Sequence, residues 1–308
     1  MSVQTLDSTE QKPLSWWQRL RANGTLLPYL LVLPTLLLIL VIAIYPMLDS
    51  FWISTQDNPL IAQPVFVGLA NYIQVLKDPQ FQGSVLNTLI FTVVSVFLET
   101  VCGLGIALLI NKTFPGRGLV RAAILVPWAF PTVVSAQMWL LMYNDQTGII
   151  TYILQLLHLL PHGATLLGSS SGVIIAALVT DVWKTTPFMA LLILAGLQVI
   201  PNELYEAADV DGSTPVQSFW RITLPLLRDP LLIALLFRSL DAIRVFDLFY
   251  IFGARSVPSM ASYADLRLFA GTTADFAPGV AAAVIVFLFA LVISLVFISM
   301  MRNMLRQI

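Results

Sequence analysis

Hydrophobic residues fill six long segments of the chain, and shorter polar stretches separate them. The segments cover approximately residues 27–53, 84–110, 119–143, 172–199, 230–252 and 279–301. Each is long enough to cross a bilayer as a helix, which takes roughly 20 predominantly apolar residues. The fifth segment is the least apolar, because it contains Arg238, Asp241, Arg244 and Asp247. The pattern predicts an all-α membrane protein with six transmembrane helices.

The composition points to the same class of protein. Of the 308 residues, 58% are hydrophobic and only 11% are charged, whereas soluble domains carry about 25% charged residues. The formal net charge of −1 provides no basic surface for nucleic acid, so we expect no nucleic-acid partner. One cysteine and two histidines are too few for the usual metal-binding patterns. We therefore expect a lipid-embedded chain without a metal site.

Lysine and arginine are distributed unequally between the two ends of the predicted spans. Ten lie in the N-terminal tail, the second-to-third loop, the fourth-to-fifth loop and the C-terminus, and three lie in the other loops. Because positive residues accumulate on the cytoplasmic side, both termini and the loop at 200–229 are predicted to be cytoplasmic. The tail, residues 1–26, contains LSWWQRLRAN, which predicts either an interfacial helix or a simple anchor. The transmembrane domain then covers 27–308.

The loop at 200–229 is the most organised polar stretch. Asn202 can cap the start of a short helix, which we expect to run to about Asp211. Gly212 supplies the backbone freedom that ends this helix. Thr214 begins a second helix with the sequence TPVQ, which has the spacing of a capping box with proline at the first helical position. Local chemistry leaves open whether the loop docks on a partner or packs only on its own bundle.

A spaced motif lies within this loop. It comprises Glu206-Ala207-Ala208, Gly212 after three residues, Ile222 after nine more, and Leu224-Pro225 after one more. The motif resembles the EAA loop of permease subunits in binding-protein-dependent ABC importers. The segment DVWKTTPFMALLILAGLQVIPNELYEAADVDG is similar to the sugar branch of that family, of the maltose, trehalose or glucosylglycerol type. The resemblance implies the type I ABC importer (MetI-like) permease fold.

The resemblance also implies a set of partners. They are a second homologous permease, two cytoplasmic ATPase subunits and an extracytoplasmic sugar-binding protein, assembled in a bacterial inner membrane. The loop would be the coupling helix that docks on the ATPase. ATP and Mg would be bound by that partner, because this chain lacks the glycine-rich phosphate-binding motif. We therefore expect no cofactor and no catalytic residue in this chain, which would not itself be an enzyme.

The resemblance assigns roles within the coupling loop. Glu206 would pair with a basic residue of the ATPase, and Ala207 and Ala208 would allow close approach. Gly212 would make the turn between the two short helices. The remaining members of the predicted coupling set are Asp211, Ile222, Leu224 and Pro225.

Four charges of alternating sign recur at every third position of the fifth span. On one continuous helix, Arg238, Asp241, Arg244 and Asp247 would form a fanned ladder of neighbouring side chains. Ionisable residues inside a membrane face the bundle interior or a water-filled cavity. Two interpretations are open: the charges neutralise one another and fix helix packing, or they line a translocation path. Glu99 stands alone in the second span and carries the same alternatives.

Asp181 and Lys184 form a similar pair, three residues apart in the fourth span. By resemblance, maltose-type permeases hold sugar midway along the spans before and after the coupling loop. The residues at those positions are Asp181, Val182, Lys184, Thr185, Phe188, Asp241, Ala242, Arg244 and Val245. Carboxylates and cations suit sugar hydroxyls as acceptors and donors, and aromatic faces suit the apolar side of a sugar ring.

Two functions follow from these features. The first is a permease subunit of an ATP-driven importer for a di- or oligosaccharide or a sugar-derived osmolyte. The alternative is a gradient-driven secondary transporter in which the charge ladder and Glu99 form a proton relay. The EAA-like loop favours the importer, because a gradient-driven carrier does not require it.

Overall fold

The computed structural model describes residues 26–57, 59–60, 63–253 and 255–305. The tail with its expected interfacial helix lies outside these residues. The chain divides into two units, 1–52 and 53–308. The described part of the first unit is one helical run, made of α2 (Leu26–Ile39), a π-helical turn η1 (Leu40–Ile44) and α3 (Tyr45–Ile53), whose last residue opens the second unit. This run matches the first predicted span.

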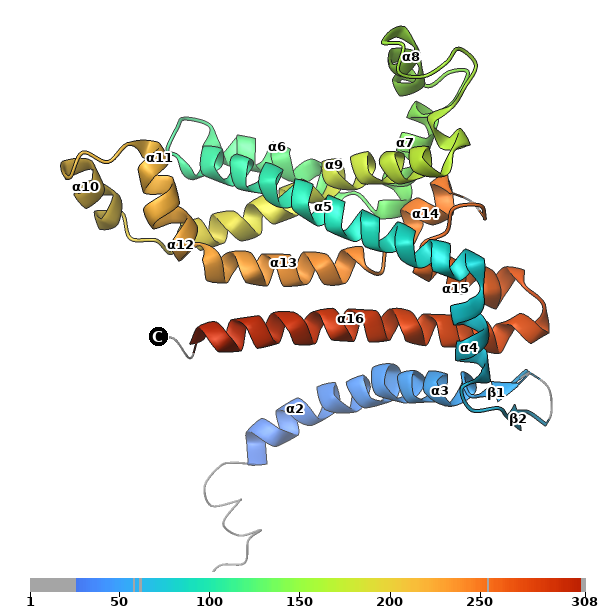
Figure 1. Cartoon of the computed structure of the whole chain (residues 1–308). Coiled ribbons are helices and arrows are strands. Elements are labelled where there is room, and N and C mark those ends of the chain that lie inside the picture. The colour runs from blue at the N-terminus through green and yellow to red at the C-terminus, as the bar shows by residue number, and fades with distance from the viewer. Residues whose placement is uncertain (1–25, 58, 61–62, 254, 306–308) are drawn as a thin grey trace, which may run out of the picture. The chain divides into compact units, whose positions relative to one another are not determined.

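Three long helices and two divided ones form the frame of the second unit (Figure 1). The long helices are α5 (Pro79–Asn111), α9 (Ser170–Leu197) and α16 (Phe276–Leu305). The divided ones are α6 (Arg117–Ala129) with α7 (Thr132–Met142), and α13 (Arg228–Ala242) with α14 (Asp247–Phe252). Of these, α5, α9 and α13 pack against one another.

Shorter elements connect this frame. They are the antiparallel pair β1 (Gln56–Asp57) and β2 (Val65–Phe66), α4 (Ala70–Lys77), α8 (Ile149–Leu156), η2 (Leu166–Gly168), α10 (Glu203–Val210), α11 (Pro215–Ser218), η3 (Phe219–Thr223), α12 (Leu224–Leu226), α15 (Met260–Asp265), η4 (Leu266–Ala270) and η5 (Thr273–Asp275).

Four helices among the described residues are long and apolar enough to cross a membrane, and the bent pair α6–α7 makes a fifth. The predicted spans at 84–110, 172–199 and 279–301 coincide with α5, α9 and α16. The fifth predicted span, 230–252, does not meet the same test of length and hydropathy. It contains charged residues, and it is divided into two helices that are each too short to cross alone.

The third span bends sharply between α6 and α7, whose axes differ by 86°. Phe130 adopts an extended conformation with ψ 140°, and Pro131 follows it. A proline disfavours the helical conformation of the residue before it. Helix α6 therefore ends at Ala129, and helix α7 begins at Thr132.

The fifth span breaks between Ala242 and Asp247. One carbonyl released by this break, that of Val245, accepts a hydrogen bond of 2.6 Å from the Ser259 hydroxyl. Non-helical backbone at membrane depth is tolerated only where protein buries it or where it lines a cavity. The break is therefore expected to lie against protein or a cavity rather than against lipid.

The crossing of α5 and α9 is close because Gly103 lies there. A Cβ atom at Gly103 would lie 3.0 Å from the Cβ of Met189 and 3.1 Å from the backbone nitrogen of Ala190. Glycine thus permits the two backbones to approach. Glu99, one helical turn earlier on α5, is brought against the middle of α9.

Candidate functional site

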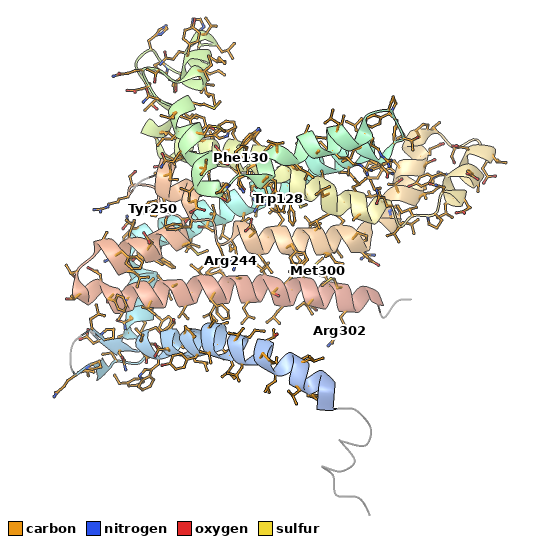
Figure 2. The ribbon with its side chains drawn as sticks, turned by 180° about the vertical axis from the view of Figure 1, so that it is seen from behind. Trp128, Phe130, Arg244, Tyr250, Met300 and Arg302 are labelled. Atoms are coloured by element: carbon orange, nitrogen blue, oxygen red, sulfur yellow. The ribbon has the colours of Figure 1, made fainter. Side chains whose placement is uncertain are left out.

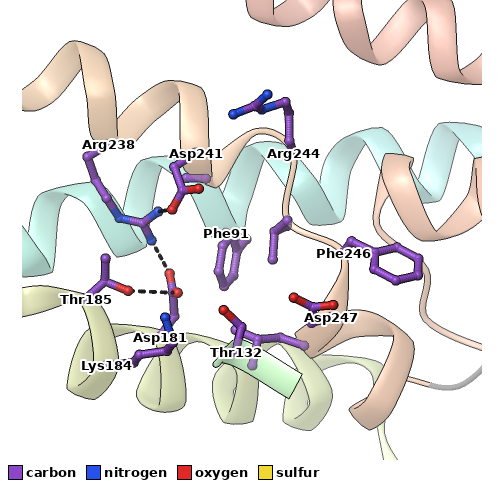
Figure 3. Close-up of a pocket in the computed structure, with 13 residues that line it drawn as sticks. Phe91, Thr132, Asp181, Lys184, Thr185, Arg238, Asp241, Arg244, Phe246 and Asp247 are labelled. Carbon is purple, nitrogen blue, oxygen red and sulfur yellow. Dashed lines mark hydrogen bonds and ion pairs between the residues drawn. The ribbon is translucent and has the colours of Figure 1, made fainter. Parts of the chain in front are cut away.

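A cavity of about 160 Å³ lies where the two divided spans break (Figure 3). Its lining comes from α5, α7, α9, α13, α14 and the segment 243–246. Seven of the nine residues predicted for the substrate path line it: Asp181, Lys184, Thr185, Asp241, Ala242, Arg244 and Val245. Residues that sequence reasoning placed on two separate spans thus share one chamber.

Arg238 is the centre of a polar cluster on the wall of this cavity. It is only 1% exposed, and its Nε and Nη2 donate to the two carboxylate oxygens of Glu99, the Nη2–Oε1 distance being 2.9 Å. Nη1 donates to Asp241 Oδ2 at 2.9 Å, and Nη2 also donates to Asp181 Oδ2. We call these four residues the Arg238 cluster. It joins α5, α9 and α13.

Sequence reasoning singled out all four members of this cluster and the neighbouring pair Arg238 and Asp241, but not the connection of Glu99 and Asp181 to Arg238. The expected pairing of Asp181 with Lys184 is wrong, because Asp181 bonds Arg238 and its Oδ1 accepts from the Thr185 hydroxyl at 3.2 Å. Glu99 was left without a partner, although it is fully buried. A lone carboxylate in an apolar span requires a buried cation, and that signal could have indicated Arg238.

The continuous charge ladder is also wrong. Only its first step, Arg238 to Asp241, forms an ion pair, because helix α13 ends at Ala242. Arg244 lies beyond this end, its Nε donates to the Leu240 carbonyl at 3.0 Å, and it points away from Asp247 (Figure 3). Asp247 begins a new helix, α14. The break removes the chain of neighbours that a proton relay would need.

Aromatic side chains gather at the two breaks. The other two predicted path residues, Val182 and Phe188, do not line the cavity, and Phe188 stacks on Trp128 with ring centroids 5.3 Å apart. Trp128, Phe130 and Tyr250, labelled in Figure 2, are 44–50% exposed. These faces lie on the elements that flank the cavity, α6 and α14.

The predicted coupling loop folds as two short helical segments joined by a tight turn. Helix α10 ends with the Ser213 amide bonded to the Ala208 carbonyl and the Gly212 amide bonded to that of Asp209. This is the Schellman pattern, and Gly212 has the required positive φ of 75°. The Thr214 capping box is present, with Thr214 and Gln217 each accepting from the other's amide. Asn202 occupies the N-cap position, but its side chain makes no capping bond.

Most of the EAA-like motif faces outward. The exposed members are Glu206, Ala207, Asp211, Gly212 and Pro225, whereas Ile222 and Leu224 are half-buried and Ala208 is buried. A hydrogen bond of 3.0 Å between the hydroxyls of Tyr205 and Thr223 ties α10 to η3. Large apolar side chains are also exposed, including Val210 at 88%, Val216 at 66% and Trp220 at 62%. Such a surface fits a partner protein.

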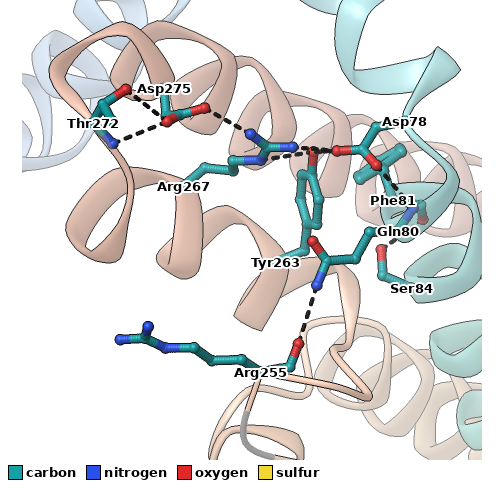
Figure 4. A network of polar contacts seen from close by, with 9 residues as sticks. All are labelled: Asp78, Gln80, Phe81, Ser84, Arg255, Tyr263, Arg267, Thr272 and Asp275. Atoms are coloured by element: carbon teal, nitrogen blue, oxygen red, sulfur yellow. Dashed lines mark hydrogen bonds and ion pairs between the residues drawn. The ribbon is translucent and has the colours of Figure 1, made fainter.

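A second arginine-centred cluster lies outside the spans, between the start of α5 and the start of α16 (Figure 4). Arg267 pairs with Asp78 and, at 2.6 Å, with Asp275. The Tyr263 hydroxyl donates to Asp78 Oδ2 at 2.6 Å. We call these four residues the Arg267 cluster. It connects the segments that lead into α5 and α16.

The protonation of the Arg267 cluster differs from that of free side chains. Burial favours a higher pKa for Asp78, but hydrogen bonds from Tyr263 and Gln80 and the charge of Arg267 outweigh it, so the pKa is lowered. Hydrogen bonds from the Thr272 amide and hydroxyl lower the pKa of Asp275. Burial raises the pKa of Tyr263 to about 12, with a contribution from its bond to Asp78.

Comparison with known proteins decides the family. The sequence profile described as "Binding-protein-dependent transport system inner membrane component" matches residues 99–307, which is more than half of the chain. The chain belongs to this family. It is accordingly a membrane-embedded permease subunit of an ABC importer and an inner membrane component.

Named relatives of this permease cover nearly its whole length. It is 42% identical over 291 residues to the "Trehalose/maltose transport system permease protein MalF" of Thermococcus litoralis, with 92% of this chain and 96% of the relative aligned. It is 36% identical over 278 residues to the "Trehalose transport system permease protein SugA" of Mycobacterium tuberculosis, with 89% and 88% aligned.

A solved structure shares the fold of this permease. It is the crystal structure of a bacterial alginate ABC transporter in complex with an alginate pentasaccharide-bound periplasmic protein, with a TM-score of 0.78 and 22% identity over 94% of this chain and 98% of that one. The type I importer permease fold expected from the EAA-like motif is confirmed. Family membership and the divided ladder both favour ATP-driven import over a gradient-driven carrier.

Proposed function

We propose that this permease carries a di- or oligosaccharide, or a sugar-derived osmolyte of the trehalose, maltose or glucosylglycerol type. The observation that carries the proposal is the convergence of Asp181, Lys184, Asp241 and their neighbours on one cavity between the two helix breaks. These side chains offer oxygen acceptors and an ammonium donor, which suit a solute rich in hydroxyls. The stacked Trp128 and Phe188 beside them would serve the apolar face of a sugar ring.

The cavity in this chain would be part of a larger site. Its volume of about 160 Å³ is below the roughly 300–1,000 Å³ of pockets that enclose small ligands. A second, homologous permease would supply the remaining wall. The complete transporter would then contain both permeases, two cytoplasmic ATPases that bind ATP and Mg, and an extracytoplasmic sugar-binding protein. Catalysis would belong to the ATPases alone.

The loop at 200–229 would couple this path to the ATPases. Its exposed Glu206 and apolar side chains form a surface that a cytoplasmic partner would cover, with both chain termini on the same side. Gly212 sets the angle between α10 and α11, because its backbone conformation opposes any residue with a side chain. A force applied at α10 would pass through η3 and α12 into α13, which carries Arg238 and Asp241.

The deciding experiment is ATP hydrolysis by the reconstituted transporter with its binding protein and a panel of neutral sugars. We expect one sugar class to stimulate hydrolysis in the wild type. Glu206→Ala is expected to abolish most of this stimulation, because the ion pair with the ATPase is lost. Absence of stimulation by any sugar, with a binding protein shown to be active, would redirect the proposal to another solute class.

A matched control lies on the same helix. Glu203 is also acidic, exposed and in the first turn of α10, but it lies outside the EAA-like motif. Glu203→Ala should therefore retain stimulation. Equal activity of the Glu206→Ala variant and the wild type would remove Glu206 from the coupling role while leaving the sugar assignment intact.

A further inference from the structure

Glu99 is the member of the Arg238 cluster that does not reach the cavity. Its side chain is 0% exposed, and it is absent from the lining residues. Both of its oxygens accept from Arg238, one from Nε and one from Nη2. A carboxylate that accepts hydrogen bonds from two nitrogens of a guanidinium fixes the plane of that group. Glu99 therefore sets the direction in which the rest of Arg238 points.

The same guanidinium holds two carboxylates that do reach the cavity, one through Nη1 and one through the Nη2 that also serves Glu99. Arg238 bonds Oδ2 of Asp181 and Oδ2 of Asp241, so one oxygen of each is taken. Oδ1 of Asp181 accepts from Thr185, and Oδ1 of Asp241 has no hydrogen-bond partner among the described residues. The Asp241 side chain is 70% exposed, against 2% for Arg238. Oδ1 of Asp241 is thus a free acceptor on a side chain that the buried Arg238 holds in place.

We propose that Glu99 and Arg238 are positioning residues, which hold the carboxylates of Asp181 and Asp241 as hydroxyl acceptors of the substrate path. The inference rests on the proposed function. It adds that the solute is recognised through its hydroxyl groups, because fixed carboxylates accept hydrogen bonds from them.

Helix packing alone does not account for this arrangement. One carboxylate neutralises one guanidinium, and burying a second, here that of Asp181, costs several kcal/mol. The cluster nevertheless places three carboxylates on one arginine, with those of Asp181 and Asp241 directed at the cavity (Figure 3). A role in binding a ligand would explain the additional carboxylates of Asp181 and Asp241.

The test measures the number of sugar molecules imported per ATP hydrolysed by the complete transporter in liposomes. Glu99→Gln keeps the size of the side chain but can accept through one oxygen only, so the guanidinium turns and the two carboxylates shift. We expect the ratio of sugar to ATP to fall about 10- to 100-fold, since misplacement of about 1 Å has effects of this size. ATP hydrolysis stimulated by the loaded binding protein should persist.

Two further variants separate positioning from folding. Ser95→Ala changes a buried residue one turn away on the same helix and should leave the ratio unchanged. Glu99→Asp retains the charge but shortens its reach, so it should assemble normally and lower the ratio to an intermediate value. Failure of both Glu99 variants to assemble would assign the cluster to helix packing and overturn the proposal.

The remaining outcomes are equally decisive. A Glu99→Gln transporter that assembles and keeps the wild-type ratio would also overturn the positioning role. A wild-type transporter that imports no sugar at all would instead defeat the proposed function itself, so the two failures are distinguishable.

Discussion

The Arg238 cluster and the Arg267 cluster use the same chemistry in different surroundings. Each places one arginine between carboxylates from different elements. The Arg238 side chain is 2% exposed and that of Arg267 is 30% exposed. Water can partly replace a lost partner around Arg267, whereas around Arg238 a lost partner leaves a buried charge uncompensated. The degree of burial, rather than the type of residue, therefore determines how much each cluster contributes to the stability of the fold.

The largest expected effect follows removal of the buried cation. Arg238→Met fills similar space but leaves Glu99 and Asp181 without their counter-charge. We expect destabilisation of about 3–5 kcal/mol, as for other buried pairs that lose one partner. The melting temperature and the yield of solubilised complex would show it.

The control for that variant is Arg244→Met. Arg244 is exposed and forms no ion pair within the described residues, so its removal should lower the melting temperature by much less. Equal losses in the two variants would show that burial does not distinguish the two arginines.

A smaller effect is expected from Arg267→Met. The variant removes ion pairs to Asp78 and Asp275 at a partly exposed site, so we expect a loss of about 1–2 kcal/mol. Thermal unfolding of the purified permease would measure it. Arg255→Met is the matched control, because Arg255 contributes its backbone carbonyl rather than its charge to Gln80. A loss as large as that of Arg238→Met would contradict the comparison.

The smallest effect concerns pH. Asp78 and Asp275 have lowered pKa values in the folded protein, so the stability that they provide is present above their ordinary value of 3.8 and is lost as pH falls below it. The difference in melting temperature between wild type and Arg267→Met should therefore shrink below about pH 4. A difference that stays constant down to pH 3 would show that ion pairing at Arg267 contributes little.

Much of the fold could be predicted because local chemistry determines it. Long apolar runs located α5, α9 and α16, and Pro131 marked the bend of the third span. The Gly212 turn and the Thr214 cap depend on residues within a few positions of each other, so the sequence displays them. The EAA-like motif could likewise be located from its residues and their spacing alone. Its coupling role stays a prediction.

The features that sequence reasoning missed depend on distant residues. No proline or glycine marks the break after Ala242, where the sequence reads IRVF, and a hydrogen bond from Ser259 helps to support it. Glu99 and Arg238 are separated by 139 positions, so no spacing rule connects them. The sequence indicates that a buried carboxylate needs a cation, but which cation it pairs with depends on how α5 and α9 cross at Gly103.

The break in the fifth span also has a consequence for how such transporters diversify. Ile243 is buried and its amide bonds the Ser239 carbonyl, but the side chains of Arg244, Val245 and Phe246 are exposed or half-buried, so these three can be exchanged without disturbing the core. They border the chamber, while the buried support at Glu99 and Arg238 lies on intact helices. Substitutions in this short stretch can therefore adapt the permease to a new cargo, and a library confined to these three positions is the natural starting point for redirecting it.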